Sequence, residues 1–125
     1  MLGNINVVAT VAVRNLDAAR PFYEDKLGLT PLETNEQEVV MYKAGNTALQ
    51  VYVSQYAGTN KATAATWDVG GDIFRIAQDL KAKGVVFERY DFPEVRLEGD
   101  VHVFKELNVA WFKDPDGNIF CIHGK

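Results

Sequence analysis

The chain lacks the features that mark several classes of protein. Its 125 residues include one cysteine, Cys121, so no disulfide can form within the chain. The first residues have neither the charged region nor the long apolar region of a signal peptide. No apolar run approaches the roughly 20 residues that a membrane-spanning helix requires. We therefore expect a cytoplasmic protein without a membrane partner.

Positive charge is also scarce. The 13 Lys and Arg residues are outnumbered by 17 Asp and Glu residues, which gives a formal net charge of −4, and the basic residues form no cluster. Nucleic acid is thus not an expected partner, because contacts to phosphates need concentrated positive charge. The acidic balance mildly favours a cationic ligand. The length fits one domain, and a hydrophobic content of 47% is sufficient for a buried core.

The most informative stretch is Asp114-Pro115-Asp116-Gly117-Asn118. Proline fixes φ at the second position of a turn, the two carboxylates can accept bonds from nearby N–H groups, and glycine tolerates positive φ. The stretch therefore predicts a tight turn between two strands. In the strand that follows, Phe120 and Ile122 alternate with three residues of the opposite face, namely Ile119, Cys121 and His123.

The remaining residues repeat one order of elements. In the first half, the pattern predicts a strand over 5–13, a helix over 16–27 that is irregular at Pro21, and strands over 38–43 and 47–53. In the second half, it predicts a strand over 64–69 with Trp67 in the core, and a helix over 72–84. Each helix ends at a glycine the same distance after its strand, which indicates an internal duplication.

These patterns predict an α+β fold of two tandem βαβββ modules, residues 1–56 and 62–125, within a single domain over 1–125. A helix is expected to cover one face of each curved mixed sheet, and the other faces are free to surround a ligand. Residues 92–106 contain proline, glycine and many charges, so they predict a hairpin or lid outside the core.

Several motifs, in order along the chain, resemble the vicinal oxygen chelate superfamily. They are Asn15-Leu16, Phe22-Tyr23, Leu27-Gly28-Leu29, Gly84-Val85, and Phe112 followed by the turn motif at 114–118. This superfamily includes glyoxalase I, extradiol dioxygenases, and fosfomycin and bleomycin resistance proteins. The resemblance covers nearly the whole chain and implies paired βαβββ modules around a U-shaped cleft, usually in a homodimer. It does not specify an activity.

Metalloenzymes of this superfamily hold a divalent ion with His and Glu side chains. The resemblance places the corresponding positions on Val8, on or beside Gln50, on Ala64 and on Cys121. These residues do not provide the charged oxygens and imidazoles that such ions require. We therefore expect no metal and no other cofactor, and hence no metal-dependent glyoxalase or dioxygenase reaction.

The predicted function is metal-independent binding of a small organic molecule, aromatic or antibiotic-like, in the manner of resistance proteins that sequester a drug. No catalytic residue is expected. The expected ligand-binding residues are Thr10, Gln50, Tyr52, Thr66, Asp68, Trp111, Cys121 and His123. For Trp111 the sequence leaves open whether the side chain faces the ligand, and for Cys121 an inert buried thiol is favoured over a nucleophile.

Two alternatives remain at this point. The chain is an enzyme if a displaced metal, or an acid–base pair formed by Asp68 and His123, supports a glyoxalase-like lyase, isomerase or dioxygenase reaction. The simpler interpretation is that Asp68 bonds to the turn that follows it, while His123 lies at a solvated chain end. The chain is a scaffold if the cleft serves only as a dimer interface. The sequence also leaves open whether one chain or two form the cleft.

Overall fold

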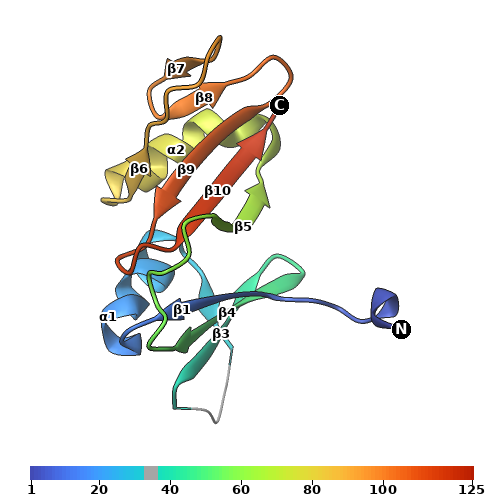
Figure 1. Cartoon of the computed structure of the whole chain (residues 1–125), viewed down its shortest axis with the longest axis vertical. Helices are drawn as coiled ribbons and strands as arrows, with labels where there is room; N and C mark the ends of the chain where they lie inside the picture. The colour runs from blue at the N-terminus through green and yellow to red at the C-terminus, as the bar shows by residue number, and fades with distance from the viewer. Residues whose placement is uncertain (33–36) are drawn as a thin grey trace.

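The computed structural model describes residues 1–32 and 37–125, which form two β-sheets with helices on one side (Figure 1). The first sheet has the order β1-β4-β3-β2 and comprises β1 (Ala9–Val13), β2 (Thr30–Pro31), β3 (Val39–Ala44) and β4 (Thr47–Val53). The second sheet has the order β5-β10-β9-β8-β7, with β6 paired to β9. Its strands are β5 (Thr63–Asp68), β6 (Val86–Glu88), β7 (Arg96–Glu98), β8 (Val101–Val103), β9 (Asn108–Lys113) and β10 (Ile119–Gly124).

The first strand of each sheet is followed by a helical region. The first begins as α1 (Leu16–Arg20) and continues as the π-helical segment η2 (Pro21–Lys26), so the irregularity predicted at Pro21 is present. Short 3-10 turns form η1 (Leu2–Asn4) and η3 (Gly70–Asp72), and the latter leads into α2 (Ile73–Ala82). Within the described part of the chain, no helix is long and apolar enough to cross a membrane.

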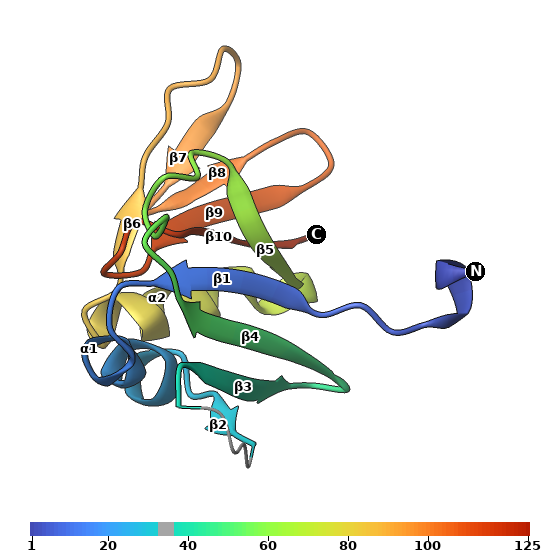
Figure 2. The same cartoon turned by 60° about the horizontal axis from the view of Figure 1, so that its bottom comes forward.

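The two sheets repeat one pairing scheme, which confirms the α+β fold. Strand β1 runs parallel to β4, and β5 runs parallel to β10, each at the edge of its sheet. These two edge strands lie side by side (Figure 2). The first strands of the two sheets therefore adjoin within a single chain.

The core lies between the sheets and the helices. Alternate residues of each strand face the helices, among them the buried side chains Val11 and Val51 of the first sheet. In the second sheet, the Trp67 ring stacks on Phe112 at 6.2 Å between centroids and packs against Phe120 at 5.6 Å. Trp67 thus belongs to the core, as the strand parity predicted.

The predicted turn between β9 and β10 joins the two halves of the molecule. Asp114 is buried and accepts hydrogen bonds from the Tyr23 hydroxyl group of η2 and from Asn118. The Asn118 side chain also donates to the Ala12 carbonyl of β1 at 2.7 Å. Gly58 has φ +81° and its added Cβ would lie 2.6 Å from the Asp116 carbonyl oxygen, so only glycine fits there. The turn is therefore a polar junction that fixes one half on the other.

Two predictions about the elements need correction. Residues 5–8 of the predicted first strand are outside β1, whose pairing with β4 begins at Ala9 opposite Leu49. Residues 92–106 do contain a hairpin, formed by β7 and β8, but their exclusion from the core was wrong. Strand β8 pairs with β9, and this pairing buries Val101 and His102.

Candidate ligand-binding site

On the first sheet, the helix-free face carries small and polar side chains. Thr10 of β1 lies opposite Gln50 of β4, and their side chains approach within 3.5 Å. Tyr52 lies two pairs further along, opposite Ala12, and is 37% exposed. The strand register thus places these three predicted ligand-binding residues on one surface.

On the second sheet, a row of side chains crosses three strands. Thr66 of β5 lies opposite Cys121 of β10, which lies opposite Trp111 of β9. Cys121 is buried, and this burial raises the pKa of its thiol, although a hydrogen bond with Thr66 acts in the opposite direction. A raised pKa keeps the thiol neutral near pH 7, which disfavours a nucleophilic role.

Asp68 and His123 are also neighbours in the register, on β5 and β10. The Asp68 carboxylate accepts a hydrogen bond from the backbone N–H of Gly70 at 3.1 Å, which is the local bond that its position before the turn predicted. The Nδ1 atom of His123 is buried and has no hydrogen-bond partner among the described residues. A buried polar atom of this kind is an exception among folded proteins, where such atoms are usually paired.

An aromatic cluster surrounds Trp111, and the sequence pattern did not predict it. The rings of Tyr90, Phe92 and His102 lie 5.3, 5.9 and 5.0 Å from the Trp111 ring, centroid to centroid. His102 is fully buried and accepts a hydrogen bond from the Tyr90 N–H at Nε2, while its Nδ1 lies 3.3 Å from the Val109 carbonyl oxygen. The sequence signal was the high density of aromatic residues between 90 and 111, a stretch that includes the segment 92–106 assigned to a hairpin or lid.

Two hollows flank Trp111, which is itself half-buried. A hollow of about 260 Å³ lies on the side of Tyr90 and Phe92 and is also lined by Lys61. A second and more open hollow of about 550 Å³ lies on the side of Phe104. Of the predicted ligand-binding residues, Trp111 is thus the one that lines both of these hollows.

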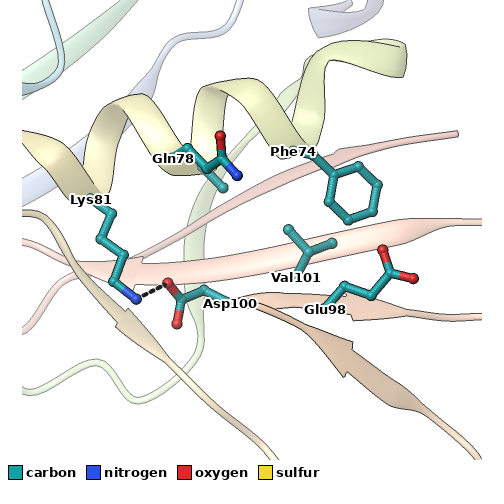
Figure 3. A pocket seen from close by; sticks show the side chains of 8 residues that line it. Phe74, Gln78, Lys81, Glu98, Asp100 and Val101 are labelled. Carbon is teal, nitrogen blue, oxygen red and sulfur yellow. Dashed lines mark ion pairs between the residues drawn. The ribbon is translucent and has the colours of Figure 1, made fainter.

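A further hollow of about 400 Å³ lies between α2 and the β7–β8 hairpin (Figure 3). Phe74 and Val101 form part of its lining, and Lys81 of α2 pairs with Asp100 across it at 3.1 Å. Glu98, at its other side, is paired with Arg96 at 2.6 Å. The charged groups of this hollow therefore already have partners, and the Lys81–Asp100 pair connects the hairpin to the helix.

The residues at the positions of the superfamily's metal ligands do not fit a divalent ion. Val8 precedes β1, and Gln50, Ala64 and Cys121 lie on β4, β5 and β10. Across residues 1–32 and 37–125, no three His, Cys, Asp or Glu side chains lie close enough together to hold a metal. The donor set of this chain thus differs from the one that supports metal chemistry in related enzymes.

The glyoxalase/bleomycin resistance protein/dioxygenase superfamily model matches residues 4–122, so the chain belongs to this superfamily. The resemblance inferred from the sequence motifs is therefore confirmed. No curated protein matches the sequence.

Solved structures show the same fold. A glyoxalase family protein from Enterococcus faecalis is similar with a TM-score of 0.72 and 21% identity, covering 98% of this chain and 99% of that one. The fosfomycin resistance protein FosX from Listeria monocytogenes is similar with a TM-score of 0.71 and 13% identity, covering 100% of this chain and 95% of that one. Lactoylglutathione lyase from Agrobacterium tumefaciens is similar with a TM-score of 0.70 and 16% identity, covering 97% of this chain and 93% of that one. At these identities the likeness concerns the fold alone.

Proposed function

We propose that this protein binds a small, partly aromatic organic molecule on the helix-free faces of its sheets, without a metal ion and without transforming the molecule. The observation that carries the proposal is the position of Trp111, half-buried among aromatic rings and shared by two hollows. An aromatic surface with a few polar groups nearby is typical of small-molecule sites.

The energetics of binding follow from the part of the indole that remains exposed. Each 40 Å² of apolar surface that a ligand covers contributes about 1 kcal/mol. Stacking on an aromatic ring adds about 0.5 to 1.5 kcal/mol. Thr66 lies on the same face, two strands from Trp111, and its hydroxyl group is a candidate hydrogen-bonding group for the ligand.

A screen of small aromatic compounds by thermal unfolding tests this function. A ligand that binds the folded state raises the melting temperature in proportion to the logarithm of its concentration over Kd. Hits are expected to lose their effect in Trp111→Ala and to retain part of it in Trp111→Phe, which keeps an aromatic ring. Hits that stabilise Trp111→Ala as well as the unaltered protein would place the ligand elsewhere.

Metal independence is tested by elemental analysis after incubation with Zn, Ni, Mn and Fe salts and removal of the excess. We expect no stoichiometric retention, and the same ligand affinity with and without EDTA. Stoichiometric retention that disappears in the double variant Asp68→Ala, His123→Ala would contradict the metal-free proposal. It would move the protein toward the lyase or dioxygenase members of the superfamily.

A second candidate function, acid–base catalysis by Asp68 and His123, is favoured by the unpartnered Nδ1 of His123. It predicts turnover of a bound compound that stops in His123→Ala while binding persists. Asp68 already accepts a bond from Gly70, so its availability as a base is reduced. Product analysis by mass spectrometry after prolonged incubation distinguishes this function from binding alone.

The proposal includes a homodimer. The segment before β1 exposes apolar side chains, with Ile5 at 65% and Val7 at 88% exposure, and a second copy of the chain covers them in the proposed assembly. Light scattering at several protein concentrations gives the mass. The double variant Ile5→Ser, Val7→Ser is expected to weaken association, and an unchanged dimer would assign the interface to another surface.

A further inference from the structure

The hollow of about 260 Å³ beside Trp111 combines aromatic walls with a single charged side chain. Tyr90, Phe92 and Trp111 provide the aromatic surface, and among the described residues of the lining Lys61 is the only ionic group. Thr63 adds a hydroxyl group at the start of β5. The composition suits an aromatic molecule that carries a negative group at its edge.

The loop that carries Lys61 is held by its own hydrogen bonds. The Asn60 side chain accepts from the Ala62 N–H at 3.0 Å and donates to the Ala62 carbonyl at 3.0 Å, so it brackets Lys61 from both neighbouring positions. Thr59 donates its hydroxyl group to the Tyr56 carbonyl at 2.7 Å. The backbone at Lys61 is therefore ordered before a ligand arrives, which reduces the entropic cost of binding.

The one charged side chain that lines this hollow is positive, although the chain is acidic overall and Asp91 lies next in sequence to the lining residues Tyr90 and Phe92. Lys113 lies on β9 near Trp111, but it pairs with Glu88 at 2.8 Å. Lys61 takes no part in the seven ion pairs found among residues 1–32 and 37–125. Because salt screens exposed charges over about 8 to 10 Å, the nearest charge outweighs the distant net charge of −4.

We propose that this hollow binds a planar aromatic carboxylate or a similar aromatic anion, with Trp111 as the stacking surface and Lys61 as the counter-ion. The inference rests on the proposed function, because it names the ligand class of the same site. It also replaces the cationic ligand that net charge alone favoured. A positively charged ligand would meet Lys61 at the rim, whereas an anion completes an ion pair there.

Three probes of one shape test the inference: 2-naphthoate, 2-naphthamide and 2-naphthylmethylammonium, which carry a negative, a neutral and a positive group. Calorimetry gives their affinities, and the indole N–H resonance of Trp111, assigned with Trp111→Phe, reports the site. We expect naphthoate to bind most tightly. Lys61→Met is expected to weaken naphthoate about three- to fivefold, the range of an exposed ion pair, and to leave naphthamide unchanged. Lys105→Met, in the neighbouring hollow, is the matched control and is expected to change neither.

The outcomes separate the inference from the proposed function. If all three probes shift the Trp111 resonance with equal affinity, or if Lys61→Met has no effect on naphthoate, the preference for anions is wrong and the aromatic site stands. A larger effect of Lys105→Met than of Lys61→Met also overturns the assignment of the counter-ion. If none of the three probes shifts the Trp111 resonance, the proposed function itself fails, and the inference fails with it.

Discussion

The helix-free faces of the two sheets differ although one pairing scheme builds both. The face of the first sheet carries Thr10 and Gln50, which contact each other weakly at 3.5 Å, and the exposed Tyr52. The face of the second sheet carries Trp111 and the fully buried His102 within a cluster of aromatic rings. The backbone arrangement therefore does not decide where a ligand binds, because the side chains of each copy were free to differ.

The difference also concerns how well polar groups are satisfied. At the junction between the sheets, the Asp114 carboxylate accepts bonds from Tyr23 and Asn118, so this region is fixed. On the second face, the His123 Nδ1 is buried without a partner in the described structure. Buried polar groups are usually paired, so this nitrogen differs from the satisfied groups of the junction.

The largest effect is expected when the junction that holds the two faces together is broken. Asp114→Ala leaves the Tyr23 hydroxyl group and the Asn118 amide without their acceptor, which lowers the free energy of unfolding by about 3 kcal/mol. Urea denaturation measures this loss. Arg14→Met removes the ion pair to Asp116 and a hydrogen bond of 3.3 Å to the Ala57 carbonyl, and it serves as the control, with an expected loss of about 1 kcal/mol. Equal losses in both variants would contradict a special role of the buried carboxylate.

The next largest effect is expected for the free energy of unfolding when a buried residue of the second face is changed, compared with a change on the first face. His102→Phe removes the acceptor of the Tyr90 N–H and is expected to cost about 1 to 3 kcal/mol. Gln50→Met changes a half-buried side chain with one long contact, so a loss within about 0.5 kcal/mol is expected. Thermal and urea unfolding measure both. A stable His102→Phe protein would mean that packing alone, without the hydrogen bond, maintains the cluster.

The affinity for a ligand also distinguishes the helix-free face of the first sheet from that of the second. For an aromatic ligand found in the screen, Trp111→Ala is expected to weaken binding about tenfold, since the stacking surface is lost. Tyr52→Ala, which removes the largest predicted binding residue of the first face, is expected to weaken binding less than about threefold. Calorimetry measures both affinities. The reverse order of effects would assign the main contact to the first sheet.

The smallest effect concerns the Cys121 thiol and depends on pH. Burial raises its pKa in the folded state above the ordinary value, so the folded protein holds this proton more strongly than the unfolded chain does. The resulting stability is complete below the ordinary thiol pKa of about 8.5 and is lost as pH rises through the raised folded value. The difference in unfolding free energy between the unaltered protein and Cys121→Ala should therefore shrink between pH 7 and pH 10. Iodoacetamide should react slowly with the folded protein at pH 7, and rapid alkylation would contradict the buried, neutral thiol.

Much of the fold was predictable from local patterns. The motif at 114–118, the Pro21 irregularity and the parity that places Trp67 in the core depend on residues close in sequence, and all three are present in the structure. The eight predicted ligand-binding residues all lie on strands, whose side chains alternate between two faces. Whether each of them contacts a ligand stays a prediction.

The sequence by itself determined the order of elements, their duplication, the tight turn before the last strand and the membership of the superfamily. The tertiary structure decided that β1 begins at Ala9, that β8 joins β9, and that His102 is buried beside Trp111. It also decided that Lys61 lies beside the aromatic cluster. The physical reason is that alternation and turn chemistry act between neighbouring residues, whereas the pairing of β8 with β9, and of Lys61 with Trp111 across one hollow, joins residues that only folding brings together.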